Sequence, residues 1–232
     1  MICRPTHDHR ERHSPSRPAA GVSILEAGCG TGGNLAMLAS HGHVHATEMN
    51  REAMGFATSR GIGAIRPGRL PDNIGFGTKG FDLIVLLDVL EHMDDDSGAL
   101  RALCNRLNPN GWLVITVPAY RMLWSHHDEI HHHKRRYTLD SLCQAAYAAG
   151  CSVSYVSYFN FWLLPAIALV RLVQRWIFST GGDNLTIPPS WLNSALTGLL
   201  ASERYFLGHR RLFPFGLSLL LVAQRATLTD IP

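Results

Sequence analysis

The sequence predicts an α/β fold: a doubly wound, mostly parallel sheet of seven strands with an antiparallel last strand and a helical insert. Two observations carry this prediction. Short apolar runs alternate with helical segments from residue 22 to residue 117, which is typical of right-handed strand–helix–strand units. The run 81–87 (FDLIVLL) is apolar almost throughout, as expected for a central parallel strand covered on both faces. A length of 232 residues, of which 46% are hydrophobic, suits one large domain.

The predicted elements follow one another at short intervals. We expect strands at 22–27, 44–48, near 64–65, at 81–87 and at 112–117, alternating with helices at 34–40, 51–60 and 97–107. The third helix should stop at the turn 108–111 (NPNG). A helix at 139–149, ended by Gly150, then leads into a sixth strand at 151–158. Two helical segments, 163–178 and 190–207, precede a last strand at 215–224, which should form an antiparallel hairpin with the sixth.

Residues 1–20 are rich in Arg, His, Ser and Pro and contain no apolar run. This favours a disordered leader over a secretory signal, with the folded domain at 21–232. The formal charge of +3 is too small for the broad basic face of a nucleic-acid-binding protein. The five cysteines are odd in number and no pair has CxxC spacing. We therefore expect neither a disulfide scaffold nor a zinc ribbon, but reduced thiols in a cytoplasmic protein.

A glycine-rich turn, 26–33 (EAGCGTGG), closes the first predicted strand and opens a helix. Glycines there let the backbone turn sharply and let a ligand lie directly against it. At the end of the second strand stands Glu48, whose carboxylate can accept both hydroxyl hydrogens of an adenosine ribose. The turn and the later acid together predict an adenosine-containing cofactor.

The turn alone does not name that cofactor, because Gly28, Gly30 and Gly33 also satisfy the GxGxxG spacing of NAD-binding enzymes. Glu26, immediately before the turn, argues against NAD. Its negative charge would repel a pyrophosphate but would suit the ammonium group of a methionine moiety.

Three motifs, in the expected order across residues 22–117, resemble those of class I S-adenosylmethionine-dependent methyltransferases. The resemblance is closest to the subgroup that includes ubiquinone-biosynthesis O-methyltransferases. It implies a Rossmann-like methyltransferase fold and S-adenosylmethionine as the cofactor. The motifs are 24–32 (ILEAGCGTG), then 81–84 (FDLI) with 88–93 (DVLEHM), and the turn 108–113 (NPNGWL) into strand five.

By this resemblance the glycine turn and the acids around it form the cofactor site. Glu26 and the turn hold the methionine end, and Glu48 binds the ribose. Met49 lies beside the adenine, and Asp88 lines the pocket. The chain departs from the family at 66–72 (RPGRLPD), where many members place an acid facing the adenine amino group. The cofactor-binding residues of the turn are Gly28, Cys29, Gly30 and Gly32.

A polar, histidine-rich segment at 119–137 follows the fifth strand and should lie at the carboxyl edge of the sheet, where ligands bind. It resembles a pattern in a bacterial subgroup of the same methyltransferases, and we expect it to be a substrate lid. The matching positions are Trp124, His127, Asp128, His133, Arg136 and Tyr137, whereas His126, His131 and His132 look like local additions. Of the matching positions, Trp124, His133, Arg136 and Tyr137 are the expected substrate-binding residues.

Three interpretations of this segment stay open. In the first, His127 is a general base oriented by Asp128, and Arg136 binds an anionic group. His92 is a second catalytic candidate, although a solvated histidine at a helix start explains it equally well. In the second, the histidines bind a divalent metal with Glu91 and His92, but adjacent histidines cannot easily converge, so we predict no metal site. In the third, these residues only pin the lid through hydrogen bonds.

No charged residue occurs between Asp140 and Arg171, so a transmembrane helix has to be considered. Asn160 and Pro165 interrupt the apolar run, and one crossing would leave the last strand on the wrong side of the membrane. We therefore expect an amphipathic helical insert at about 160–212. It either roofs the active site or offers a surface for a lipid tail, for peripheral contact with the inner membrane face, or for a second copy of the chain.

These observations predict a methyltransferase that acts on a small-molecule or lipid-linked acceptor, with oxygen as the expected acceptor atom. Methyl transfer from a sulfonium needs alignment and exclusion of water, and a base only where the nucleophile is a hydroxyl or a protonated amine. The alternatives are an NAD(P)-dependent reductase and a non-catalytic cofactor-binding scaffold. We expect no nucleic-acid partner, and the oligomeric state stays open.

Overall fold

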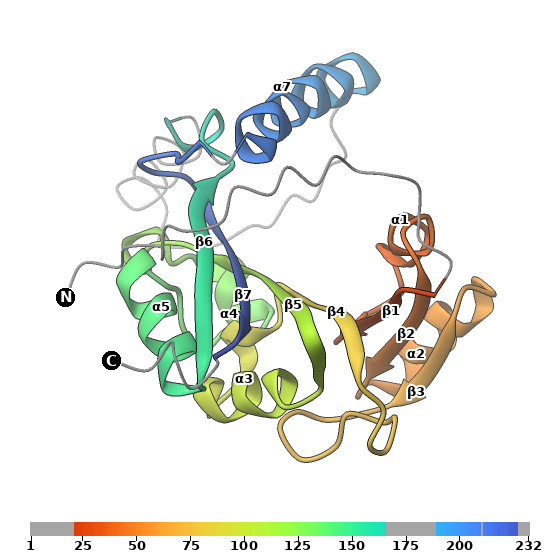
Figure 1. Ribbon diagram of the computed structural model, residues 1–232. Coiled ribbons are helices and arrows are strands. Elements are labelled where there is room, and N and C mark those ends of the chain that lie inside the picture. Colours follow the sequence, from red (N-terminus) through yellow and green to blue (C-terminus); the bar gives the residue numbers. More distant parts are fainter. Residues whose placement is uncertain (1–20, 166–188, 210, 227–232) are drawn as a thin grey trace.

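A computed structural model describes residues 21–165, 189–209 and 211–226. The predicted leader at 1–20 and most of the predicted helix at 163–178 lie outside these residues. Within the described part of the chain, seven strands form one sheet in the order β3-β2-β1-β4-β5-β7-β6 (Figure 1). The strands are β1 (Ser23–Ala27), β2 (His43–Glu48), β3 (Ala64–Pro67), β4 (Phe81–Leu87), β5 (Leu107–Pro118), β6 (Cys151–Phe159) and β7 (Ser218–Arg225).

The strand directions confirm the predicted fold class. Every neighbouring pair from β3 to β5 is parallel, whereas β7 lies antiparallel between β5 and β6. The strand β4 coincides with the predicted run 81–87. The expected antiparallel pairing of β6 with β7 is also present, although the helical insert connects them.

Helices cover both faces of the sheet. The helices α3 (Asp96–Cys104) and α5 (Leu139–Ala148) pack on one another and on β5 and β6. The helices α1 (Leu35–Ala39) and α2 (Arg51–Ser59) contact β2, and α2 also contacts β3. Two separate buried apolar clusters result, one for each group of helices.

The start of β5 differs from the sequence prediction. The helix α3 ends at Cys104, and the strand already begins at Leu107, so the predicted turn at 108–111 lies inside the strand. Leu107 pairs with Phe81, and the register then shifts before Trp112 pairs with Leu83. A side chain at Gly111 would approach the Phe81 carbonyl oxygen to 2.9 Å. The NPNG sequence therefore forms a bulge that keeps its pairing with β4.

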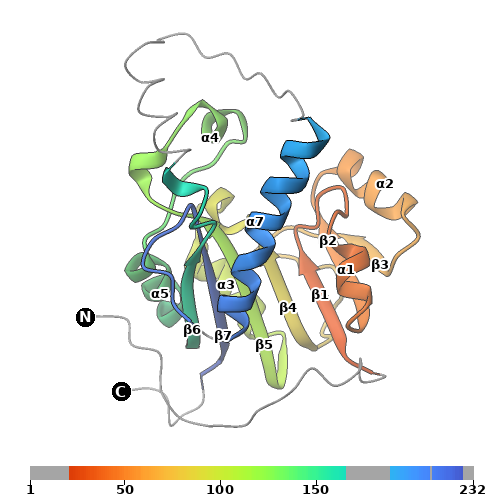
Figure 2. The same cartoon turned by 90° about the horizontal axis from the view of Figure 1, so that it is seen from above.

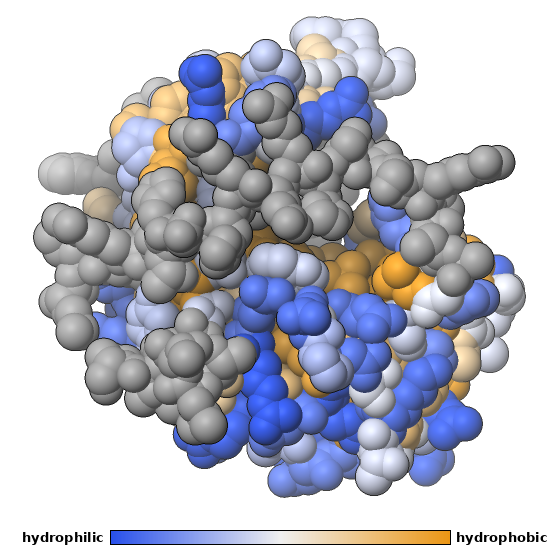
Figure 3. Space-filling model, viewed as in Figure 1, coloured by the Kyte–Doolittle hydropathy of each residue, from blue (hydrophilic) through white to orange (hydrophobic). Residues whose placement is uncertain are grey.

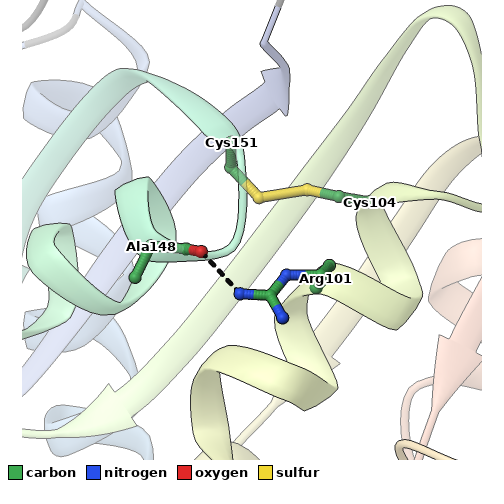
Figure 4. The surroundings of a disulfide bond; sticks show 4 residues. All are labelled: Arg101, Cys104, Ala148 and Cys151. Carbon is green, nitrogen blue, oxygen red and sulfur yellow. Dashed lines mark hydrogen bonds between the residues drawn. A yellow bond between two sulfur atoms is a disulfide. The ribbon is translucent and has the colours of Figure 1, made fainter. Parts of the chain in front are cut away.

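One expectation about the cysteines is wrong. Cys104 and Cys151 form a disulfide, 47 residues apart in sequence (Figure 4). The end of α3 and the start of β6 meet because α3 packs against α5, the helix that leads into β6. The Arg101 side chain spans the same junction and donates to the Ala148 carbonyl oxygen at 2.8 Å. No short-range spacing signals such a pair, which the tertiary packing alone brings together.

The topology gathers five chain segments at the carboxyl edge of the sheet. The glycine turn follows β1, Glu48 ends β2, and the 3-10 helix η1 (Leu90–His92) follows β4. The histidine-rich segment follows β5, and it contains η2 (Arg121–Leu123) and α4 (His126–Ile130). Because β6 runs in the same direction as β5, the insert between β6 and β7 leaves from this edge too.

The described part of the insert is dominated by α7 (Ser190–Gly208), which lies beyond the carboxyl end of β6 (Figures 1 and 2). Glu203 of α7 is 2% exposed and anchors the helix. Its carboxylate accepts hydrogen bonds from the backbone of Asn160 at 2.6 Å and of Trp162 at 3.1 Å. In the part of the chain that the structure describes, no helix combines the length and the hydropathy needed to cross a membrane.

Candidate active site

The glycines of the turn differ in how much space surrounds the position that a side chain would occupy. Gly28 has φ +77°, and a side chain there would meet a Val89 methyl carbon at 2.7 Å. Gly32 has φ +79°, and a side chain there would collide with Leu35. Gly30 has φ +53°, but nothing lies within 4 Å of the position its side chain would take. Gly28 and Gly32 therefore allow close packing, and Gly30 leaves an open surface for a ligand.

Glu48 is held directly against this turn. Its Oε2 accepts a hydrogen bond from the Gly30 backbone N–H at 2.8 Å, and its Oε1 accepts one from the Asn50 backbone N–H at 2.8 Å. A carboxylate has about four lone-pair sites, so capacity remains for the two hydroxyls of a ribose. Met49, the next residue, is 65% exposed and is free to cover an adenine.

Glu26 supplies a negative group beneath the turn. It is 1% exposed, and its Oε1 accepts the Asn34 side-chain amide at 2.9 Å. No hydrogen-bond donor among the described residues reaches its Oε2. Burial raises the pKa of this carboxyl, and the Asn34 hydrogen bond only partly opposes that rise. A buried carboxylate oxygen without a partner fits an incoming cation such as the ammonium group of a methionine moiety.

Cys29 and Asp88 complete the predicted cofactor residues. Burial, together with the nearby Glu26 and Glu48, raises the pKa of Cys29 to about 11, so this thiol stays neutral. Asp88 follows β4 with φ 53°, and its Oδ1 accepts the Thr116 hydroxyl at 3.2 Å. Desolvation raises the pKa of Asp88, and the nearby His133 and His92 oppose that rise. His133 and His92 therefore lie close enough to Asp88 to affect its ionisation.

Asp128 is the centre of the histidine-rich segment, but its partners differ from those expected. It is fully buried, and its Oδ1 accepts a hydrogen bond from His133 Nδ1 at 2.9 Å. Arg136 donates to both carboxylate oxygens, at 2.7 and 3.0 Å. Burial opposes ionisation, yet hydrogen bonds from Arg136, the Ser125 backbone and His133 lower the pKa of Asp128 to about 2. The structure thus pairs Asp128 with His133, and the orientation of His127 by Asp128 stays a prediction.

Two further substrate candidates have structural partners. The Arg136 side chain is 5% exposed, and besides Asp128 it donates to the Ala119 carbonyl oxygen at 3.0 Å, so its donors already have acceptors within the chain. Tyr137 is 3% exposed, and its hydroxyl donates to Asp96 at 2.9 Å. Both residues hold the segment against the sheet, which corresponds to the third interpretation drawn from the sequence. Trp124 follows η2 and is half-buried.

His133 reaches from this segment to the turn after β4. Its side chain is 12% exposed, and its Nε2 lies 3.9 Å from Oε1 of Glu91. Its ring meets that of His92 edge-on, with 4.7 Å between centroids. Burial and the neighbouring His133 lower the pKa of His92, which favours a neutral ring. Because Asp128 occupies Nδ1 of His133, Nε2 is the nitrogen that faces the cluster.

Glu91 was not among the predicted catalytic residues. It is fully buried, and both of its carboxylate oxygens are without hydrogen-bond partners among the described residues. Burial raises its pKa to about 8. The sequence signal was the Glu-His pair a few residues after a buried central strand, but sequence alone does not show which of the two side chains points inward.

The site and the fold together define a class of protein. A glycine turn after β1, an acid at the end of β2 and an antiparallel β7 between β5 and β6 are the features of a class I methyltransferase. The chain belongs to the methyltransferase-domain family, whose model matches residues 4–156. It is an S-adenosylmethionine-dependent methyltransferase, and the reductase and the non-catalytic scaffold considered from the sequence are set aside.

Known proteins resemble the chain at modest identity. It is 26% identical over 159 residues to a ubiquinone biosynthesis O-methyltransferase of Aeromonas salmonicida (strain A449), a match covering 59% of this chain and 66% of that protein. A methyltransferase structure from Mesorhizobium loti aligns with a TM-score of 0.58 at 18% identity, covering 90% of this chain and 93% of that one. Phosphoethanolamine N-methyltransferase 2 of Haemonchus contortus, bound to S-adenosyl-L-methionine, aligns with a TM-score of 0.59 at 15% identity, covering 93% and 51%. These structures share the fold.

Because one oxygen of Glu26 has no partner among the described residues, a substitution there should weaken the binding of the cofactor without lowering the stability of the fold. The variant Glu26→Gln should bind S-adenosylhomocysteine about 10- to 100-fold more weakly, because a hydrogen bond to a charged group is worth about 1.5–3 kcal/mol. Its melting temperature should not fall, because the neutral amide is cheaper to bury than the carboxylate. Isothermal titration and thermal unfolding measure the two quantities. Glu129→Gln, at an exposed carboxylate, is the matched control, and equal affinity in all three proteins would contradict the assignment.

Proposed function

We propose that this enzyme methylates a hydroxyl oxygen of a small acceptor that carries an apolar portion, and that the hydroxyl loses its proton beside His133. One observation carries the proposal: the buried Asp128–His133 pair directs an imidazole nitrogen toward the interior of the carboxyl edge. Methylation of a hydroxyl needs such a group, because an alkoxide or phenolate is a far better nucleophile than the neutral oxygen.

Two groups of residues at the carboxyl edge of the sheet have separate roles, one in binding the cofactor and one in deprotonating the acceptor. Glu26, Gly30 and Glu48 bind and orient the cofactor, which supplies an electrophilic methyl group on a sulfonium sulfur. Asp128 accepts a hydrogen bond from Nδ1 of His133 and so fixes the ring. The acceptor oxygen gives up its proton at this cluster, its lone pair forms the bond to the methyl carbon, and the carbon–sulfur electron pair stays on sulfur.

The apolar portion of the acceptor is suggested by the insert. Hydrophobic side chains are exposed on α7 and nearby, including Trp191 at 71% and Tyr205 at 65%. Figure 3 shows hydrophobic residues across the middle of the molecule, between the upper part that carries α7 and a hydrophilic lower half. The printed name of the Aeromonas relative, a ubiquinone biosynthesis O-methyltransferase, supports an oxygen acceptor and a quinone-like or lipid-like substrate.

The test is methyl transfer from labelled S-adenosylmethionine to paired acceptors. Catechols with and without a long apolar tail are compared with the corresponding anilines. We expect label in the hydroxyl compounds and a lower KM for those with the tail. Label only in the amines would overturn the oxygen assignment, and equal KM values with and without the tail would overturn the apolar contact.

A comparison of two histidines tests which one serves the hydroxyl. His133→Ala should lower kcat/KM by about 100-fold or more, which is the usual contribution of acid–base catalysis. His127→Ala should change it by less than about threefold, because Asp128 pairs with His133. Affinity for S-adenosylhomocysteine should be the same in both variants. A large loss in His127→Ala with normal turnover in His133→Ala would restore the base first inferred from the sequence.

A further inference from the structure

Glu91 has fewer hydrogen bonds than the other buried carboxyl groups of the site, since within the described ranges Glu26 lacks a partner on one oxygen only. Glu91 is fully buried with neither oxygen hydrogen-bonded among the described residues, whereas the equally buried Asp128 has donors on both oxygens. Burial without hydrogen bonds costs free energy for any polar group and most for an ionised carboxylate, and the nearby basic atom His133 Nε2 is still 3.9 Å from Glu91 Oε1. The backbone holds it there, because the Glu91 carbonyl oxygen accepts the Lys134 N–H at 2.9 Å. A bound cation would supply the partner that the Glu91 carboxylate lacks in the described part of the chain.

Two histidines bring suitable ligand atoms to the same point. One atom each of Glu91, His92 and His133 lie within 4.8 Å of one another. Ligands around a tetrahedral cation at about 2.1 Å are separated by roughly 3.4 Å, so shifts of about 1 Å would complete the geometry. Two imidazoles and one carboxylate are a ligand set that proteins use for catalytic zinc, with a further position left open.

The surroundings of His133 strengthen this interpretation. A histidine that binds a metal usually donates its second ring N–H to a carboxylate, which fixes the ring and raises its basicity. Asp128 accepts His133 Nδ1 in that way, so Nε2 points to Glu91. The same carboxylate is held by Arg136 and by the Ser125 backbone. The histidine is therefore oriented before any ion arrives.

We propose that Glu91, His92 and His133 bind one divalent cation of the zinc class, and that this ion holds the acceptor oxygen during methyl transfer. The role in transfer rests on the proposed function, whereas the binding site stands on the cluster alone. A hydroxyl bound at the open position would release its proton near neutral pH. His133 then acts as a ligand of the ion and not as a base: the proton passes to solvent, the oxygen lone pair bonds to the methyl carbon, and the carbon–sulfur electron pair remains on sulfur. From the sequence we considered a metal bound by the histidines with Glu91 and His92 but predicted no metal site, because histidines 131–133 are adjacent; the cluster uses only one of those three.

The experiment is isothermal titration of the full chain with zinc chloride, after chelator treatment and without cofactor or acceptor. We expect one site per chain with micromolar affinity or tighter. Glu91→Gln and His133→Ala should each weaken it by about 100-fold, since even residues that only support metal ligands contribute 10- to 100-fold. His126→Ala removes an exposed histidine of the same segment and should leave it unchanged. His92→Ala is the reserve variant if Glu91→Gln does not fold, as judged by S-adenosylhomocysteine binding.

The outcomes separate the two proposals. Zinc affinity that is equal in wild type, Glu91→Gln and His133→Ala would overturn the metal site. Methylation of hydroxyl acceptors at full rate in the chelator-treated enzyme would also overturn it, while the proposed function would stand. Zinc binding that depends on Glu91 and His133, without methylation of any hydroxyl compound, would support the site and overturn the oxygen acceptor.

Discussion

Glu48→Ala is expected to weaken S-adenosylhomocysteine binding by at least about 100-fold, the largest effect on affinity that we predict for a single side chain. Two hydrogen bonds from ribose hydroxyls to a carboxylate contribute about 1.5–3 kcal/mol each. The same carboxylate also accepts a hydrogen bond from the Gly30 backbone N–H at 2.8 Å, so its loss frees the turn against which we expect the cofactor to lie. Isothermal titration at fixed ionic strength measures the change.

Two variants decide whether this loss is specific. Glu52→Ala removes a nearby exposed carboxylate on α2 and should leave the affinity within about twofold of wild type. Glu48→Gln keeps one side-chain oxygen as an acceptor and should fall between wild type and Glu48→Ala. Binding by Glu48→Ala within about threefold of wild type would mean that the ribose contacts another group.

The features that the sequence predicted correctly are local ones. The run 81–87 is apolar without interruption because β4 lies at the centre of the sheet, and its bounds match those expected. Glu48 ends β2 as expected, and its carboxylate accepts a hydrogen bond from the Gly30 backbone N–H, whereas its binding of the ribose stays a prediction. Each signal lies within one segment whose neighbours follow from the parallel strand order.

What the sequence did not predict depends on contacts between segments. Asp128 points inward because Ser125 and Asp128 form a capping box at the start of α4, and its carboxylate there meets His133. The burial of Glu91 follows from the short η1 turn and from the backbone bond that Lys134 adds. A Ser-x-x-Asp capping signal was present, but it gave no information on which histidine would meet the carboxylate.

Asp128→Asn is expected to cause the largest loss of stability, about 3–5 kcal/mol, and to abolish the orientation of His133. The variant leaves the Arg136 guanidinium, 5% exposed, without its counter-charge. Removing one partner of a buried ion pair costs that much because an uncompensated charge stays inside. For a chain of this size each kcal/mol corresponds to roughly 2–4 °C in melting temperature. Glu129→Gln, at the adjacent exposed carboxylate, should melt within about 2 °C of wild type.

The pH dependence of this difference tests its electrostatic cause. The folded-state pKa of Asp128 lies at about 2, below the ordinary value of 3.8. A carboxyl with a lowered pKa stabilises the fold above its unfolded value, and that contribution disappears as the pH falls through the folded value. The gap in unfolding free energy between wild type and Asp128→Asn should therefore be constant above about pH 5 and shrink by about 2 kcal/mol toward pH 2. A gap that stays the same across this range would assign the loss to packing, and the charge of Asp128 would then matter only for the way it holds His133.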